Sequence, residues 1–191
     1  MSDQVSQVPD VDRLVGEIDQ LRTKVAQLQE RVEELDQLAH EDTLVNLPNR
    51  RGFMRALERF IDRACRYGEH SAMLYVDLDG LKMINDSFGH PAGDQALIQV
   101  SRLMVGGVRK SDIVARIGGD EFAILLAHSD EANAHEAATR LVDLIAGCDY
   151  THEGDALPLS VAIGIGMITG DETPEEVIAR ADEEMYRRKA A

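Results

Sequence analysis

The sequence predicts an α+β domain with a ferredoxin-like βαββαβ core, preceded by a long N-terminal coiled-coil helix. Three observations support this prediction: an apolar heptad repeat near the N-terminus, short apolar runs that alternate with helical patterns, and a Gly-Gly turn between two such runs. With 191 residues, 44% of them hydrophobic, the chain can bury one substantial core and carry an extension. We expect a disordered polar tail at 1–10, a parallel dimeric coiled coil at 11–39 and one folded domain at 40–191.

The heptad repeat places β-branched residues at one seam position and leucine at the other. The two series are Val11, Ile18, Val25 and Val32, and Leu14, Leu21, Leu28 and Leu35. This pattern favours a parallel two-stranded coiled coil, about 42 Å long at 1.5 Å per residue, and therefore a homodimer. Glu17 with Arg22, and Arg31 with Asp36, have the offset of salt bridges between two chains. The alternative is a lone amphipathic helix packed on its own domain.

The repeat breaks down near the end of this helix. Leu35 and Leu38 are three residues apart, and Ala39 and Asp42 then fall on seam positions. The offset resembles a stammer, a local overwinding that would let the stalk switch register and rotate the domains. Fraying of the helix end is the alternative.

The expected elements of the domain follow in the order helix, strand, helix, strand, strand, helix, strand, helix. Apolar residues at helical spacing predict an entry helix at 53–64 and further helices around 97–104 and 137–145. Short apolar runs predict strands at 73–76, 112–116, 122–127 and 159–167. The last helix is expected to begin at a capping box formed by Thr173 and Glu176.

Composition excludes several classes of function. The net charge of −15, from 20 basic and 35 acidic residues, argues against a partner with a nucleic-acid backbone, which requires a positive surface. Two cysteines cannot form a disulfide framework, so we expect a reducing, cytoplasmic setting. No apolar run approaches the roughly 20 residues that span a bilayer, and the polar N-terminus carries no signal-peptide pattern.

The turn between the strands at 112–116 and 122–127 carries two glycines and two acids. Gly118 and Gly119 are expected to supply the positive φ of a tight hairpin and to let a ligand approach the backbone. A turn alone does not require the adjacent, mutually repelling carboxylates of Asp120 and Glu121. The pair favours a metal or phosphate site, and an acidic solvent-exposed hairpin is the alternative.

A third carboxylate, Asp77, follows the first strand directly. In a split βαβ sheet this strand lies beside the hairpin, so Asp77 can meet Asp120 or Glu121 at one end of the sheet. Converging carboxylates repel one another unless cations separate them, and all-oxygen ligation suits Mg²⁺ or Mn²⁺. Two such ions about 3.5–4 Å apart can clamp an in-line displacement at phosphorus. For the nearby Asp79, helix N-capping is favoured over metal ligation.

The segment after Asp79 carries polar residues that suit a purine nucleotide. Lys82 is close enough to Asp77 in sequence to reach a metal-bound phosphate. Asn85 and Asp94 could together read a guanine edge, because an amide and a carboxylate match its acceptor and donors. Taken singly, each of these residues is more often a cap or a surface residue, and a lone His90 is usually structural.

Several of these motifs occur together in the order found in one known family. They are Asp77-Leu78-Asp79, Asn85-Asp86, Gly89-His90, Gly93-Asp94 and Arg116 to Phe122, with an opening segment at 42–51 and a closing segment at 181–186. From about residue 40 to 191 the chain resembles the GGDEF family of diguanylate cyclases. The resemblance implies a nucleotidyl-cyclase-type fold and condensation of two GTP into cyclic di-GMP, with release of two pyrophosphates.

The resemblance also implies roles for individual residues. Asp77, the Leu78 carbonyl and Asp120 would hold two Mg²⁺ or Mn²⁺ ions, and Glu121 would be a proton acceptor or a further ligand. Nucleotide contacts would come from Lys82, Asn85, His90, Asp94, the Gly118 and Gly119 backbone, and Lys189. Arg109 and Asp112 fit the family's RxxD inhibitory site, with Arg116 as a helper; a surface ion pair is the alternative.

The chain departs from the family pattern at a few positions. Val45 and Asn46 replace a common Thr and Gly, and Arg188 stands where a small residue is usual. The chain ends at Ala191, before an arginine that often contacts phosphate, which would weaken nucleotide affinity. Residues 1–10 could recruit a protein partner. Two rival classes are a catalytically silent cyclic di-GMP receptor, in which the acidic hairpin residues are usually lost, and a structural coiled-coil adaptor, which leaves the convergent acids unexplained.

Overall fold

The computed structural model describes residues 11–189, except for eight side chains of the first helix, including Leu35 and Leu38. The tail expected at 1–10 and the stammer expected at Leu35 and Leu38 therefore lie outside the described residues. Internal contacts divide the chain into two compact units, with the boundary between Ala39 and His40. No helix within 11–189 combines the length and the low polarity that crossing a membrane requires.

The first unit contains the helix α1, Val11–His40. Six seam residues of its heptad repeat are between 44% and 64% exposed: Leu14, Ile18, Leu21, Val25, Leu28 and Val32. Arg13 Nε donates to Glu17 Oε1 within the same helix, at 3.2 Å. A continuous stripe of large apolar side chains therefore faces solvent in the single chain.

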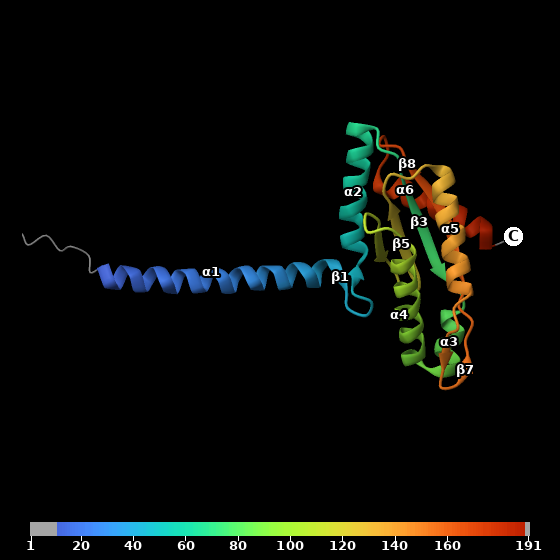
Figure 1. The fold of residues 1–191 in the computed structure, drawn as a ribbon, viewed down its shortest axis with the longest axis horizontal. Coiled ribbons are helices and arrows are strands. Elements are labelled where there is room, and N and C mark those ends of the chain that lie inside the picture. Colours follow the sequence, from blue (N-terminus) through green and yellow to red (C-terminus); the bar gives the residue numbers. More distant parts are fainter. Residues whose placement is uncertain (1–10, 190–191) are drawn as a thin grey trace, which may run out of the picture. The chain divides into compact units, whose positions relative to one another are not determined.

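The second unit is built on one four-stranded antiparallel sheet with the strand order β4-β5-β3-β8 (Figure 1). The strands are β3 (Ser71–Leu78), β4 (Ile113–Arg116), β5 (Glu121–Leu126) and β8 (Val161–Ile168). β3 pairs with β5 on one side and with β8 on the other, which is the order of a split βαβ fold. The predicted fold class is confirmed.

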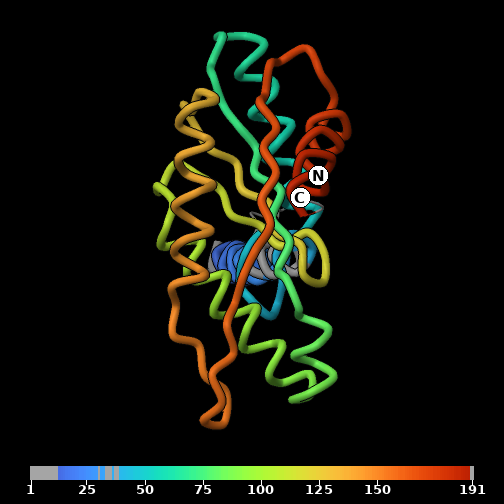
Figure 2. The backbone as a smooth tube through the Cα atoms, turned by 90° about the vertical axis from the view of Figure 1, so that its right-hand side faces the viewer, coloured from blue at the N-terminus to red at the C-terminus, as the bar shows by residue number. Residues whose placement is uncertain are grey.

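Helices cover both faces of the sheet (Figures 1 and 2). They are α2 (Arg50–Tyr67), α3 (Leu81–Phe88), α4 (His90–Gly107), α5 (Glu131–Ala146) and α6 (Pro174–Lys189). α2 and α6 bury Phe53, Leu57 and Val177 in a core against one face. α4 and α5 build a larger core against the other face, and α3 packs mainly on α4. The capping box is present, because Thr173 N donates to Glu176 Oε2 and Glu176 N donates to Thr173 Oγ1.

Local backbone geometry explains the elements that the sequence patterns missed. The segment after β3 forms two helices, because Gly89 breaks it at φ +82° and Pro91 restarts it within the first turn of α4. Two small ladders were also missed: β1 (Glu41–Asp42) with β2 (Leu47–Pro48), and β6 (Thr151–His152) with β7 (Asp155–Ala156). Asn46 lies between β1 and β2 at φ +53°, a conformation that asparagine tolerates better than most residues. The replacement of glycine there is therefore compatible with the turn.

Candidate active site

The pairing of β3 with β5 builds the candidate site. Asp77 lies directly opposite Glu121 in the antiparallel register. One residue further on, Leu78 N donates to the Asp120 carbonyl oxygen at 3.0 Å. The end of β3 and the Gly-Gly turn are therefore adjacent, as the sequence predicts, whereas the Leu78 side chain is buried in the core.

Neither glycine of the turn has a positive φ, and only Gly118 is required for its small size. Neither Gly118 nor Gly119 is among the residues with positive φ, so that expectation was wrong. A Cβ on Gly118 would lie 2.2 Å from Glu121 Oε2, whereas a Cβ on Gly119 would meet nothing within 4 Å. Ile117 N and Gly118 N both donate to the Glu121 carbonyl, at 2.9 and 3.2 Å. Gly118 thus leaves the space into which the Glu121 carboxylate folds back.

A buried tyrosine contacts that carboxylate. Tyr75 Oη donates to Glu121 Oε1 at 2.8 Å, and Tyr75 is only 6% exposed. Burial, together with the hydrogen bond to Glu121, raises the pKa of Tyr75 far above its ordinary value, so the phenol stays protonated. Tyr75 is not among the residues predicted from the sequence, although its position two residues before Asp77 on a strand places both on one face.

Lys189, at the end of α6, contacts the acids that follow β3. Its ammonium donates to Asp77 Oδ1 and lies 3.4 Å from Asp79 Oδ1. Partial burial lowers the pKa of Lys189, but the hydrogen bond and charge of Asp77, with a further contribution from Asp79, outweigh it and raise the pKa overall. Asp79 is not the predicted N-cap: Gly80 holds that position at φ +72° without a side-chain bond, and Asp79 Oδ2 accepts from Ser160 Oγ.

The acids have the chemistry of a site for a hard divalent cation. Asp77 and Asp79 already share the ammonium of Lys189, which shows that a positive charge is favourable between them. Asp120, in the Gly-Gly turn, is half-buried. All the candidate metal-ligand atoms are oxygens, as a hard divalent cation prefers. Within 11–189, however, no three His, Cys, Asp or Glu residues approach closely enough to form a complete coordination shell. The acids share one end of the sheet, and a cation would have to draw them together.

Four of the predicted nucleotide residues lie on the α3–α4 pair: Lys82, Asn85, His90 and Asp94. Asn85 Oδ1 is buried and has no hydrogen-bond partner in the described structure, and a Cβ on Gly93 would lie 2.1 Å from it. A buried amide oxygen without a partner is rare and marks a place where a donor is needed. Lys82, His90 and Asp94 are exposed around this pair of helices.

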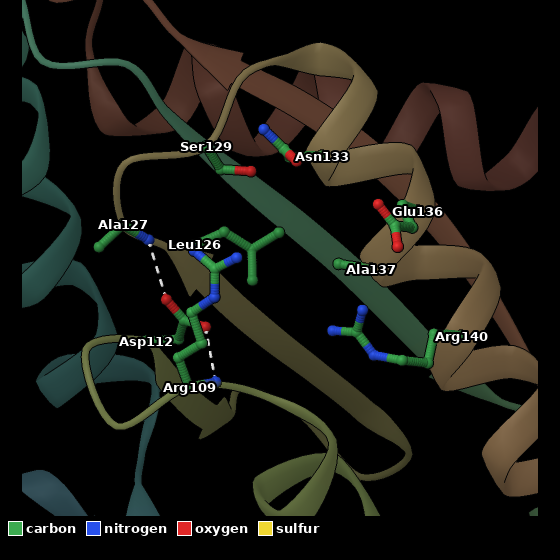
Figure 3. A pocket seen from close by; sticks show the side chains of 9 residues that line it. All are labelled: Arg109, Asp112, Leu126, Ala127, Ser129, Asn133, Glu136, Ala137 and Arg140. Carbon is green, nitrogen blue, oxygen red and sulfur yellow. Dashed lines mark hydrogen bonds between the residues drawn. The ribbon is translucent and has the colours of Figure 1, made fainter.

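Arg109 and Asp112 line a polar pocket away from the Gly-Gly turn (Figure 3). Asp112 accepts from Arg109 N at 2.9 Å and from Ala127 N at 3.1 Å, so its carboxylate is tied to the backbone. Arg140 reaches the same pocket from α5 and also donates to the Gly107 carbonyl at 3.1 Å. Arg140 is not among the residues predicted from the sequence, because a lone arginine on an exposed helix face carries no signal of its own.

Arg116 does not line this pocket, so the structure does not bring the expected helper to Arg109 and Asp112. Arg116 instead donates to the Gly119 carbonyl, at 2.8 Å from one terminal nitrogen, and to both oxygens of Asp42 at 3.2–3.3 Å. Asp42 also accepts from Leu44 N and Val45 N. Arg116 therefore ties the opening segment of the domain to the Gly-Gly turn.

Fold and site together define a nucleotidyl-cyclase-type α+β domain with an acidic sheet end. The sequence model of the family described as "Diguanylate cyclase, GGDEF domain" matches residues 39–191, and the chain belongs to this family.

Named relatives agree with that assignment. The bifunctional diguanylate cyclase/cyclic di-GMP phosphodiesterase MucR of Pseudomonas aeruginosa is 40% identical over 80% of this chain and 22% of its own length. The response regulator PleD of Caulobacter vibrioides is 34% identical over 81% of this chain and 35% of its own. The chain thus spans about a fifth to a third of these relatives.

A solved structure extends the likeness to the N-terminal helix. The coiled coil and GGDEF domain of DgcB from Caulobacter crescentus, in complex with c-di-GMP, has a TM-score of 0.84 and 25% identity. The match covers 93% of this chain and 94% of that one. The Pseudomonas aeruginosa diguanylate cyclase SiaD, in complex with its activator SiaC, has a TM-score of 0.77 and 26% identity over 93% of this chain and 69% of its own.

Proposed function

We propose that this chain condenses two GTP molecules into cyclic di-GMP and releases two pyrophosphates. The observation that carries the proposal is the register of β3 and β5, which places Asp77 opposite Glu121 beside the Gly-Gly turn. Membership of a family described as diguanylate cyclases, and curated relatives with that name, support it.

In each of two equivalent steps, the 3′-oxygen of one GTP forms a bond to the α-phosphorus of the other. The bond from that phosphorus to the β-phosphate oxygen breaks, and pyrophosphate leaves. Two Mg²⁺ or Mn²⁺ ions, held by Asp77, the Leu78 carbonyl and Asp120, would supply charge neutralisation of the triphosphate. Glu121 accepts the proton of the attacking hydroxyl or completes the ligand set, and Lys82 stabilises charge that develops on the phosphates.

The α3–α4 pair supplies the nucleotide pocket in this proposal. The Asn85 amide, whose oxygen has no partner within the described residues, and the exposed Asp94 carboxylate would contact the guanine edge, with the carboxylate accepting from its N–H groups. His90 completes the rim of the pocket. With a metal ion bound by Asp77, the Lys189 ammonium would be available to contact a phosphate.

Catalysis requires a homodimer, because each domain holds one GTP and the two must face each other across a two-fold axis. The exposed apolar stripe of α1 supports pairing through 11–39, which raises the effective concentration of the second domain to about the millimolar range. The double substitution Leu21→Pro with Leu28→Pro should leave GTP binding intact and make turnover depend steeply on protein concentration. Unchanged activity at nanomolar enzyme contradicts this role of the stalk.

Product inhibition is proposed at the pocket of Figure 3. Arg109 and Arg140 approach it from two sides, which suits the two phosphates of cyclic di-GMP. The neighbouring Asp112 is held in place by two backbone N–H groups.

The competing proposal is a silent receptor that binds cyclic di-GMP at this same pocket and signals through α1. Incubation with GTP and Mg²⁺, followed by chromatography of the products, separates the two. Cyclic di-GMP from the wild-type chain and none from Glu121→Gln supports the enzyme. A demonstrated dimer that yields no product, yet binds cyclic di-GMP, supports the receptor.

A protein partner at the N-terminus is a further proposal, suggested by the SiaD complex with SiaC.

A further inference from the structure

The Glu121 carboxylate is held from two sides by this chain's own residues. Its Oε1 accepts from Tyr75 Oη at 2.8 Å, and its Oε2 occupies the space left by the missing side chain of Gly118. Within residues 11–189, Tyr75 is the only hydrogen-bond donor to this carboxylate. The resting position of Glu121 therefore depends on one phenol.

Tyr75 is itself well anchored. Its ring belongs to the core beneath α2 and α6, with Met73 and Ala123 among the same group of buried residues. The strand register places Tyr75 on the same face as Asp77, and Glu121 lies directly across from Asp77 on β5. Because the ring is locked by packing, its hydroxyl can hold Glu121 with little freedom.

We infer that Tyr75 is a positioning residue for Glu121, holding its carboxylate where the acidic sheet end and the attacking hydroxyl need it. The inference rests on the proposed function, in which Glu121 accepts a proton or binds metal. Tyr75 touches neither substrate nor metal in this role and acts only through Glu121. Without the Tyr75 hydroxyl, the Glu121 carboxylate can turn toward solvent. It then lies less often in the position from which it would accept the proton or bind metal.

The test compares two substitutions that each remove a single phenol oxygen. Tyr75→Phe keeps the ring and deletes the donor to Glu121. Tyr150→Phe is the matched control, because Tyr150 is also partly buried and donates to the Ala92 carbonyl at 3.2 Å. Cyclic di-GMP synthesis gives kcat and KM for each variant. Binding of Mn²⁺ in the presence of 3′-deoxy-GTP, which cannot react, is followed by electron paramagnetic resonance.

Tyr75→Phe is expected to lower kcat about tenfold with KM for GTP within about twofold, the size of one lost hydrogen bond. Its Mn²⁺ affinity should fall by a similar factor, while Tyr150→Phe changes neither quantity by more than about twofold. Thermal unfolding of both variants should remain cooperative, because phenylalanine fills the same space.

A double-mutant cycle decides whether the effect passes through Glu121. In a Glu121→Gln background, Tyr75→Phe should produce no further loss of Mn²⁺ affinity. Unchanged kcat and Mn²⁺ affinity in Tyr75→Phe overturn the inference, and so does a loss that persists in full beside Glu121→Gln. If the wild-type chain makes no cyclic di-GMP, the proposed function fails, while the Mn²⁺ measurements still report on Tyr75 and Glu121.

Discussion

Two aspartates have contrasting surroundings: Asp77, near the end of β3 beside the Gly-Gly turn, and Asp112, just before β4 at the other end of the hairpin. Asp112 accepts from two backbone N–H groups, so the fold itself uses its charge. Asp77 lies opposite Glu121 across the sheet, and its side chain accepts a hydrogen bond from the long, flexible side chain of Lys189. The Asp112 carboxylate therefore supports the local structure, whereas we propose that Asp77, balanced by an ammonium that can be displaced, serves to bind a ligand.

The largest expected effect is on activity at Asp77. Asp77→Asn keeps the size of the side chain but removes the charge that we propose binds metal, so kcat for cyclic di-GMP should fall at least about a hundredfold. The midpoint of thermal unfolding should change little, because the lost contact with Lys189 is offset by weaker repulsion from Glu121 and Asp79. A large loss of stability with activity retained would show that Asp77 is structural.

Arg116 is expected to contribute to both stability and activity. Arg116→Ala leaves the Gly119 carbonyl and the half-buried Asp42 carboxylate without their shared donor, at a cost of about 1–3 kcal/mol in the free energy of unfolding. Because the Gly-Gly turn loosens, kcat should fall as well. Urea unfolding measures the loss of stability, and initial rates measure the loss of activity. Arg116→Lys should recover only part of the stability and of kcat, because lysine cannot bridge two acceptors as a planar fork does. Loss of stability alone would separate this contact from the site.

At Asp112, in contrast to Asp77, a substitution should lower stability more than activity. Asp112→Ala strands the N–H groups of Arg109 and Ala127 and should cost about 1–3 kcal/mol of stability. Initial rates, measured before product accumulates, should stay near those of the wild type. Inhibition by added cyclic di-GMP should weaken, and Arg140→Ala should weaken it without the loss of stability. Full inhibition in both variants would place the inhibitory site elsewhere.

The smallest effect concerns pH. The pKa of Lys189 is raised in the folded chain above the ordinary value of 10.5, so its contribution to stability is complete below that pH and is lost as pH rises through the folded pKa. As Lys189 is partly exposed, we expect only about 0.2–1 kcal/mol. Thermal unfolding between pH 9 and 11 should show a slightly steeper decline for the wild type than for Lys189→Met. Equal slopes would mean that the ion pair adds nothing.

The sequence predicted the parts of the site that depend on strand order. Asp77 and the Gly-Gly turn were expected to meet because apolar runs define β3 and β5, and the split βαβ order makes them neighbours. The family motifs place predicted nucleotide contacts on what the structure shows to be α3 and α4. Hydropathy missed the break between these helices at Gly89, because apolar residues continue on both sides of it.

What the sequence could not predict are contacts set by side-chain direction in three dimensions. Tyr75 read as one more apolar strand residue, Asp79 as a helix cap, and Arg116 as a helper at Arg109. Their roles depend on hydrogen-bond partners that are distant in the sequence. Glu121 is 46 residues from Tyr75, Ser160 is 81 residues from Asp79, and Asp42 is 74 residues from Arg116. Pairings at such separations leave no local pattern.

The most direct test of the account is to locate metal ions by anomalous diffraction from crystals grown with Mn²⁺ and 3′-deoxy-GTP. We expect Mn²⁺ within about 2.5 Å of carboxylate oxygens of Asp77 and Asp120, with Lys189 moved from Asp77 to a phosphate. A bound nucleotide whose metal lies away from Asp77, with the contact between Lys189 and Asp77 intact, would contradict it.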